Sequence, residues 1–314
     1  MTVTIERDVR PPGAYRLPGP GRDGTTRRGP GRSLVRLLHL DDEPIVVHVW
    51  GASGAVRLRA EAATRAAAAH GIERMRFALA LDLDLREFRT RFKADPLLGP
   101  VVRRRADLRP RRNPEPFQTL AWAVCEQLIE VERAQAIERR LVYRWGRPSA
   151  CGELRDAPTA AALGGRSQAE LEACDLAGKR SLTLIRAARE VATGRADLSV
   201  AGRADARLRR ISGIGPWTLE KLAYHGQGDL DALPAGDLAY VKLVGRVEGL
   251  GRRASEDEVR EFFAPYEPYR ALAGLYALAG RRSLLADAPP PFARRPRRAR
   301  GVTSRAPRPA AGRW

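Results

Sequence analysis

One segment of the chain, Ile211–Lys242, constrains the fold and the function more than any other. It reads ISGIGPWTLEKLAYHGQGDLDALPAGDLAYVK and sets a glycine-punctuated turn between two helical patterns. Gly213 and Gly215 permit a sharp turn and leave backbone amides uncovered at the start of the next helix, where an anion is favoured. We predict that this hairpin binds a phosphate group, with Ile214 pointing into the helix pair as a plug. An ordinary corner between two helices is the alternative.

A single carboxylate follows the hairpin at a defined spacing. Asp237 stands 22 residues after Gly215 and begins a second helical pattern, Leu238–Val247. Asp often serves as the N-cap of a helix. It can also act on a nucleotide that the hairpin holds, and the two roles do not exclude each other.

The charge of the chain favours a polyanionic partner. The 314 residues include 56 Lys+Arg and 37 Asp+Glu, which gives a formal net charge of +19. Nucleic acid is the commonest partner of such a chain, although a composition rich in Arg, Ala and Gly throughout is another source of the excess. Residues 288–314 hold eight arginines and no acidic residue. They are predicted to form a disordered basic tail that raises non-specific affinity for nucleic acid, or simply a solvated terminus.

Several classes of protein are disfavoured by what the sequence lacks. Cys125, Cys151 and Cys174 are far apart and fit neither a disulfide framework nor the spacing of a zinc or iron–sulfur site. No stretch approaches ~18 uninterrupted apolar residues, and the start of the chain lacks a signal-peptide pattern. We therefore expect a cytoplasmic protein with no membrane partner and no metal held by side chains.

Composition and periodicity predict an α+β fold in four parts. A segment rich in Pro, Gly and Arg comes first and is expected to be extended or partly disordered. A small α+β domain, a mainly helical domain and the basic tail follow. The expected bounds are 1–33, 34–82, 83–286 and 287–314.

Individual elements are predicted within these parts. Two β-type runs flank the turn at 41–44, and a third strand is expected at Ala55–Arg59. The expected helices include Ala60–Ala69 ending near Gly71, a long helix over Phe117–Trp145, Lys179–Thr193, a helix over Glu256–Phe263 with a capping box from Ser255 and Glu258, and Pro268–Leu278.

These features together resemble the helix–hairpin–helix DNA glycosylase superfamily, and most closely its 3-methyladenine DNA glycosylase II type. The resemblance spans roughly residues 34–285. It rests on ISGIGPWT, PAGDLAYVK, PEPFQTLAWAVCEQLIEVERAQAI, LAGKRSLTLIRAAREVATG and YEPYRALAGLYAL. It implies a small N-terminal antiparallel β/α domain like the TATA-binding protein, followed by a mainly α-helical helix–hairpin–helix glycosylase domain.

The resemblance also assigns roles to residues at matching positions. It implies a catalytic Asp, a hairpin that holds the DNA backbone, a pair at the wedge that enters the duplex, and a pocket for the extruded base. The catalytic Asp is Asp237, and the hairpin is Gly213, Ile214 and Gly215. The pair at the wedge is Gln127 and Leu128, and the pocket residues are Trp217, Lys221 and Leu278. Members with lyase activity carry a Schiff-base lysine at the Trp217 position, so strand cleavage is not expected. No cofactor is implied beyond a monovalent cation on the hairpin carbonyls.

The chain departs from the family pattern around the wedge and the pocket. Glu126 and Glu130 replace the usual Gly before the Gln and the usual Ser after it. Two carboxylates near a DNA backbone are repulsive unless they are paired, and Arg133 is a candidate partner. Lys221 and Leu278 stand where relatives place aromatic side chains, so the pocket is expected to be less aromatic.

The resemblance implies a monofunctional DNA glycosylase of base excision repair. It would act as a monomer in the bacterial cytoplasm or nucleoid, flip alkylated purines out of double-stranded DNA, and hydrolyse the N-glycosidic bond with the help of Asp237. One alternative is a non-catalytic paralogue that binds damaged or unusually structured DNA. Another is a glycosylase whose substrate has shifted to deaminated purines.

Overall fold

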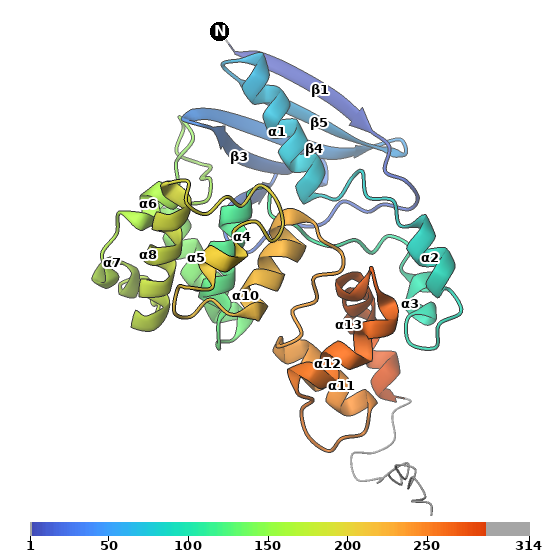
Figure 1. The fold of residues 1–314 in the computed structure, drawn as a ribbon. Coiled ribbons are helices and arrows are strands. Elements are labelled where there is room, and N and C mark those ends of the chain that lie inside the picture. Colours follow the sequence, from blue (N-terminus) through green and yellow to red (C-terminus); the bar gives the residue numbers. More distant parts are fainter. Residues whose placement is uncertain (1, 287–314) are drawn as a thin grey trace, which may run out of the picture.

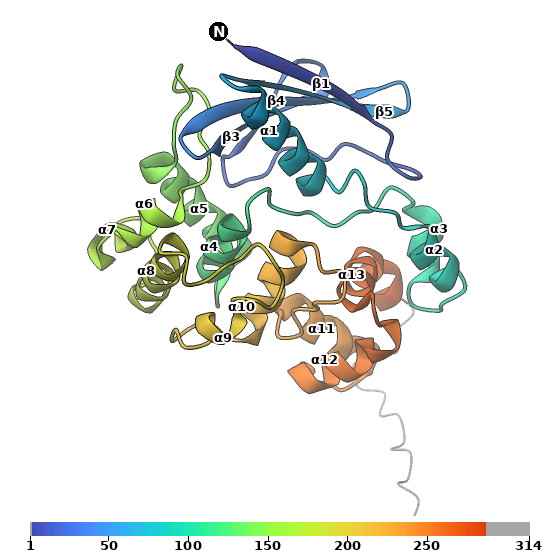
Figure 2. The same ribbon diagram turned by 45° about the horizontal axis from the view of Figure 1, so that its top comes forward.

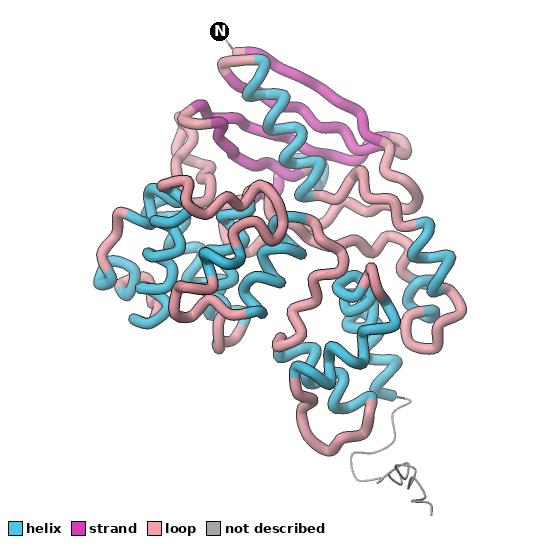
Figure 3. The backbone as a smooth tube through the Cα atoms, viewed as in Figure 1, coloured by secondary structure: helices cyan, strands magenta, loops and turns pink. Residues whose placement is uncertain are grey.

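The computed structural model of the protein describes residues 2–286, and its fold is α+β. A five-stranded sheet lies on one side of the molecule and most of the helices lie on the other (Figures 1 and 2). All strands precede residue 63, and helices and loops make up the rest (Figure 3). The predicted basic tail at 287–314 lies outside the described residues.

The sheet is antiparallel throughout, with the strand order β1-β5-β4-β3-β2. Asp41 and Asp42 connect β3 to β4, and Ser53 and Gly54 connect β4 to β5, each as a two-residue turn with a positive φ. These contacts confirm the predicted turn and the predicted third strand. The strands are β1 (Val3–Val9), β2 (Thr26–Arg28), β3 (Leu34–Leu40), β4 (Glu43–Ala52) and β5 (Ala55–Ala62).

Two strands of the sheet come from the N-terminal 33 residues, so the expectation that the α+β domain begins only at residue 34 is wrong. β1 pairs with β5 along its whole length, and β2 pairs with β3. The Pro-, Gly- and Arg-rich composition is confined to the connection between β1 and β2 and to the short turn Pro30–Arg32. β1 finds its strand partner some fifty residues later in the chain, whereas β2 pairs with the strand that directly follows it.

The first helix differs from the prediction at both ends. β5 continues through Ala62, and α1 runs over Arg65–Ala78 with Thr64 as its N-cap. Gly71 lies inside this helix rather than at its end, because the helix packs there against the sheet. A Cβ on Gly71 would lie 2.6 Å from Cγ2 of Ile45, so the glycine permits the close approach.

The remaining helices form two groups that meet near α10 (Figure 1). One core joins α2, α3 and α11 to α13, and two further cores join α4 to α10. The predicted helix Leu238–Val247 and the capping box of Ser255 and Glu258 are confirmed. The helices are α2 (Arg86–Phe92), α3 (Gly99–Arg104), α4 (Pro116–Glu126), α5 (Val131–Trp145), α6 (Ala160–Gly164), α7 (Gln168–Glu172), α8 (Gly178–Ala192), α9 (Asp205–Leu208), α10 (Pro216–Lys221), the π-helical turn Leu222–Gln227, α11 (Leu238–Val247), α12 (Glu256–Phe263), the short turn Ala264–Tyr266 and α13 (Arg270–Ala286).

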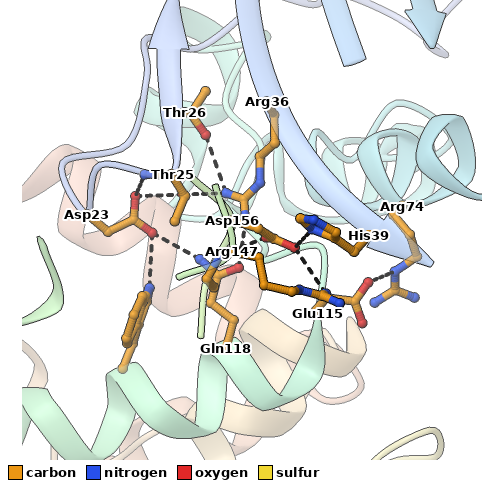
Figure 4. Close-up of polar contacts among 12 residues, drawn as sticks. Asp23, Thr25, Thr26, Arg36, His39, Arg74, Glu115, Gln118, Arg147 and Asp156 are labelled. Atoms are coloured by element: carbon orange, nitrogen blue, oxygen red, sulfur yellow. Dashed lines mark hydrogen bonds and ion pairs between the residues drawn. The ribbon is translucent and has the colours of Figure 1, made fainter. Parts of the chain in front are cut away.

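A buried polar network fixes the sheet to the helices (Figure 4). Arg36 of β3 donates to Gln118 of α4 at 2.8 Å, and Gln118 donates to Asp23 at 2.9 Å. His39 of β3 lies 3.1 Å from Asp156, which follows the helical segment 131–145. Buried polar groups are costly unless they are paired, so this network specifies how the two halves of the molecule meet.

No helix within the described range is long and apolar enough to span a membrane.

Candidate nucleic-acid interface and base site

The hairpin joins α9 to α10 with a left-handed glycine at its centre. Gly213 has φ +95°, and a Cβ there would lie 2.5 Å from Oγ1 of Thr183. The Thr183 hydroxyl of α8 donates to the carbonyl of Ser212 at 2.8 Å. Ile214 is buried in the core of α4 and α8 to α10. The hairpin is therefore held from inside by Ile214 and from one side by Thr183, a residue that the sequence analysis did not single out.

Gly215 presents an open face of the same hairpin. It is the N-cap of α10, and Pro216 occupies the first turn. No described atom lies within 4 Å of a Cβ built on Gly215, and its φ of −107° suits any residue. The first backbone amides of a helix have no partner within the helix and are available to an anion.

The wedge residues lie in a break between two helices. The predicted single helix over Phe117–Trp145 is wrong, because α4 ends at Glu126 and α5 begins at Val131. Leu128 adopts a left-handed φ of +56° and is fully exposed, at 103% of its reference area. A branched apolar residue in this conformation and environment is unusual, and such positions cluster at functional sites.

Gln127 ties this break to the hairpin. Its Nε2 donates to the carbonyl of Gly213 at 2.7 Å and to Oγ1 of Thr218 at 3.0 Å. The wedge loop and the hairpin are therefore one rigid surface feature, although they lie 86 residues apart in sequence. Thr218 was also not identified from the sequence, since a buried Thr in a helix gives no pattern of its own.

Glu126 pairs with Lys221, not with Arg133. Lys221 Nζ contacts Oε2 of Glu126 and lies 5.1 Å from the centroid of the Trp217 ring. Arg133 instead makes a two-pronged pair with Asp175, at 2.8 and 3.0 Å. The expectation that Arg133 pairs with these carboxylates, Glu126 and Glu130, is therefore wrong. The Trp217 indole Nε1 is buried and lacks a hydrogen-bond partner among the described residues.

Asp237 caps α11 and keeps its charge uncompensated. One carboxylate oxygen accepts from the amide of Ala239 at 2.9 Å, as an N-cap does. Within the part of the chain that the structure describes, no ion pair joins Asp237 to a basic side chain. A half-buried carboxylate without a cationic partner is suited to stabilise a positive charge on a ligand.

The predicted wedge and pocket residues contact different parts of the structure. Gln127 contacts the hairpin, and Lys221 contacts Trp217, while Leu278 packs on α13 against the core of α2, α3 and α11 to α13. Glu130 is exposed at the start of α5, where its side chain makes no cap bond. The pocket role of Leu278 stays a prediction.

One buried acid was also missed. Glu138 is 4% exposed and lies on the apolar face of α5 with Ala134, Ile137 and Leu141. The spacing of these four positions is that of a buried helix stripe. A glutamate within such an apolar stripe is the sequence pattern that would have indicated a buried acid.

Comparisons with known proteins give relatives that are named as a DNA glycosylase and as a DNA repair enzyme. No family model matches the chain. The chain is 27% identical over 203 residues to a DNA-3-methyladenine glycosylase of Bacillus subtilis (strain 168). The matched region covers 62% of this chain and 67% of that protein. It is 30% identical over 207 residues to a probable bifunctional transcriptional activator/DNA repair enzyme AlkA of Mycobacterium tuberculosis, covering 64% of this chain and 40% of that protein. The match thus spans less than half of the mycobacterial relative.

Solved structures share the fold. A 3-methyladenine DNA-glycosylase from Archaeoglobus fulgidus superposes with a TM-score of 0.75 at 19% identity, covering 89% of this chain and 98% of that one. A Clostridium acetobutylicum 8-oxoguanine glycosylase/lyase in complex with double-stranded DNA gives a TM-score of 0.65 at 16% identity, covering 84% and 89%.

In fold the chain is similar to solved DNA glycosylases, and in sequence it is similar to proteins named as DNA repair enzymes. The Bacillus subtilis relative and the Archaeoglobus fulgidus structure are both named as 3-methyladenine DNA glycosylases.

Proposed function

We propose that the protein is a monofunctional DNA glycosylase that removes alkylated purines from double-stranded DNA. The observation that carries the proposal is the bond from Gln127 to the hairpin carbonyl of Gly213. It fixes an exposed apolar residue, Leu128, beside a turn that offers amides to a phosphate. Apolar wedges of this kind fill the space that an extruded base leaves, and the hairpin would hold the backbone next to it.

Binding to DNA is supported by charge as well as by the hairpin. The net charge of +19 favours a polyanion. The pairing of Glu126 with Lys221 removes one of the two unfavourable carboxylates near the wedge, which weakens the case for a paralogue that binds DNA without cleaving it. We propose that the protein binds duplex DNA as a monomer in the cytoplasm or nucleoid.

Asp237 would supply the chemistry. Breaking the N-glycosidic bond builds positive charge on the sugar, and a carboxylate ~4 Å away contributes about 4 kcal/mol at an effective dielectric near 20. That is roughly three decades in rate. Asp237 can also orient or deprotonate the attacking water. Purines alkylated at N3 or N7 leave readily because they are already cationic, so no strong general acid is required.

No lyase step is proposed. Trp217 has no amine with which to form a Schiff base, and the amine one helical turn further on, Lys221, is held by Glu126. A monovalent cation on the hairpin carbonyls stays a proposal. The carbonyls of Ser212 and Gly213 each already accept a side-chain hydrogen bond.

The test is release of free base from methylated duplex DNA by wild type, Asp237→Asn and Asp257→Asn. Asp257, in the first turn of α12, is an exposed control for the same change in charge. We expect Asp237→Asn to lower the single-turnover rate by about 10³-fold, the control to match wild type, and the DNA strand to stay intact unless alkali is added. Tight binding with no release by wild type would rule out the enzyme, and equal release by Asp237→Asn would rule out that residue's role.

A further inference from the structure

A cavity of about 630 Å³ lies where the connection between β1 and β2 meets the segment between α3 and α4. The end of α1 and the turn Pro30–Arg32 contribute to its walls. None of its lining residues belongs to the hairpin, the wedge, the predicted base pocket or Asp237. The volume lies well inside the range for small-molecule sites, about 300–1,000 Å³. The cavity is therefore large enough for a small ligand and shares no residue with the proposed DNA site.

Arginine side chains make up most of the charged part of the wall. Four of them are exposed and form no side-chain hydrogen bond or ion pair within the described residues, namely Arg16, Arg28, Arg32 and Arg111. They come from the β1–β2 connection, from the end of β2, from the turn that follows it and from the segment before α4. A cleft lined by charges of one sign concentrates the field and attracts the opposite charge. These four guanidinium groups therefore favour an anion.

No acid in the wall is left to balance these charges. Asp107 is the one acidic residue that lines the cavity, and its Oδ1 accepts from Nε of Arg105, a fifth arginine of the wall, at 3.3 Å. The pair of Arg105 and Asp107 is neutral as a whole. The positive charge of the other arginines thus has no counterpart among the lining residues.

Arg109 adds a positive charge deeper in the same wall. It donates to three backbone carbonyls, among them those of Pro12 at 2.7 Å and Ala80 at 3.1 Å, and its guanidinium lies 5.5 Å from the centroid of the Tyr15 ring. Its Nε is buried without a hydrogen-bond partner within the described chain. Burial, followed by the nearby charge of Arg89, lowers the pKa of Arg109. An anion in the cavity would compensate this charge too.

The rest of the wall is apolar. Leu17, Leu79 and Leu108 line the cavity together with Pro18 and Pro110. Apolar surface of this kind favours an apolar or aromatic body. A DNA duplex presents its phosphates on a convex surface with the bases inside, so it would touch the arginines at the rim and leave the apolar wall uncovered. The combination of both surfaces in one cavity favours a small ligand over a duplex.

We propose that this cavity binds an organic phosphate, a small molecule that carries a ring and at least two phosphate groups. Guanidinium groups pair with phosphate oxygens through two parallel hydrogen bonds, which makes arginine the residue of choice for this group. Arg28 and Arg111 would hold the phosphates, and the ring would lie on the surface of Leu79 and Leu108. The binding of such a ligand is a property additional to the proposed glycosylase and does not rest on it.

The test is a calorimetric titration of ATP, without added metal, into the full chain and into Arg28→Gln, Arg111→Gln and Arg27→Gln. Arg27 precedes Arg28 on β2, is also exposed and does not line the cavity, so it is the matched control for the loss of one charge. The side chains of Arg28 and Arg111 hold no other group, so both variants should fold. We expect each to bind ATP about 10-fold more weakly, the typical contribution of one charge-assisted hydrogen bond, and the control to match wild type.

Adenosine and inorganic tripolyphosphate separate the two parts of the ligand. Both should bind wild type more weakly than ATP does, because adenosine lacks the phosphates and tripolyphosphate lacks the ring. Equal affinity for tripolyphosphate would refute the role of the apolar wall and assign an inorganic phosphate chain to the arginines. Equal affinity for adenosine would refute the role of the arginines. No binding of ATP by wild type, or the same loss in Arg27→Gln as in Arg28→Gln, would overturn the proposal.

Duplex DNA is the alternative occupant of the rim. Fluorescence anisotropy with a labelled duplex should give Arg28→Gln and Arg111→Gln the same DNA affinity as Arg27→Gln. A loss of DNA affinity in both variants that matches their loss of ATP affinity would make the rim part of the DNA interface and overturn the small-molecule site. Because the titration uses a free nucleotide, its result is independent of whether the protein releases bases from DNA.

Discussion

At the scale of single residues, two residues that depart from the pattern of the resembled family, Glu126 and Lys221, compensate each other's charge. Glu126 places a carboxylate next to the wedge, and Lys221 places an amine where an aromatic ring is usual. The structure brings the two together as an ion pair, with the Lys221 ammonium over Trp217. The sequence indicated that Glu126 requires a partner, but 95 residues separate it from the one it has. Arg133 was the nearer choice and is engaged by Asp175.

Leu128 allows function to be separated from stability. Its left-handed φ and full exposure mean that Leu128→Gly removes backbone strain and no packing. We expect the free energy of unfolding to stay within about 0.5 kcal/mol of wild type or to rise, while base release from duplex DNA falls by 10-fold or more, on the order of the few kcal/mol that extrusion costs. Urea denaturation and single-turnover release measure the two quantities. Val131→Ala, an exposed apolar residue in the next helix, should change neither; wild-type release by Leu128→Gly would contradict the wedge role.

Glu138 makes stability depend on pH in a defined direction. Its pKa rises from 4.5 to about 8 on folding, mainly through burial. Between these values the folded protein keeps a proton that the unfolded chain has lost, so the free energy of unfolding falls as pH rises through this window. Relative to that of Glu138→Gln, the free energy of unfolding of wild type should fall by a few kcal/mol between about pH 5 and about pH 8.5. The expected size is on the order of 1.4 kcal/mol per unit of pKa shift. Denaturation curves of both proteins across this range test it, and parallel pH profiles would show that Glu138 does not titrate as described.

At the scale of elements, the hairpin and the wedge loop form one unit. Residues 127–130 contain no glycine or proline, so the local sequence favours continuing the helix of Phe117–Trp145. The break is imposed instead by tertiary contacts, in which the Gln127 amide bonds to Gly213 and Thr218. Local propensity is a weak prior that such contacts override.

The two hairpin glycines should respond differently to substitution. Gly215 faces open space, so Gly215→Asp should fold normally, weaken binding to duplex DNA by adding bulk and charge against a phosphate, and reduce its salt dependence. Gly213→Ala requires a strained φ and meets Thr183, so it should lower the free energy of unfolding by about 1–3 kcal/mol. Fluorescence anisotropy at several salt concentrations and urea denaturation separate the effects. Unchanged DNA affinity in Gly215→Asp would argue against phosphate binding by the hairpin.

At the scale of the whole molecule, the sites lie where distant segments meet. One cavity, of about 300 Å³, takes its walls from the β1–β2 connection, from α4 and α5 and from the residues after α10. The polar network of Arg36, Gln118 and Asp23 sets these parts against one another beside it. A segment that composition marked as extended, residues 1–33, thus supplies both edge strands of the sheet and part of the wall of this cavity.

The sequence alone determined the parts that local patterns encode. The hairpin glycines, the helix that Asp237 begins and the turn at 41–44 follow from φ preferences, caps and periodicity, which act within a few residues. The resemblance to the glycosylases rested on those same short motifs.

Tertiary structure decided which of these parts touch. The partner of Glu126, the break that exposes Leu128, the support of the hairpin by Thr183 and the burial of Glu138 all depend on contacts between residues far apart in the chain. Burial and hydrogen bonding are properties of the folded arrangement, and no local pattern carries them.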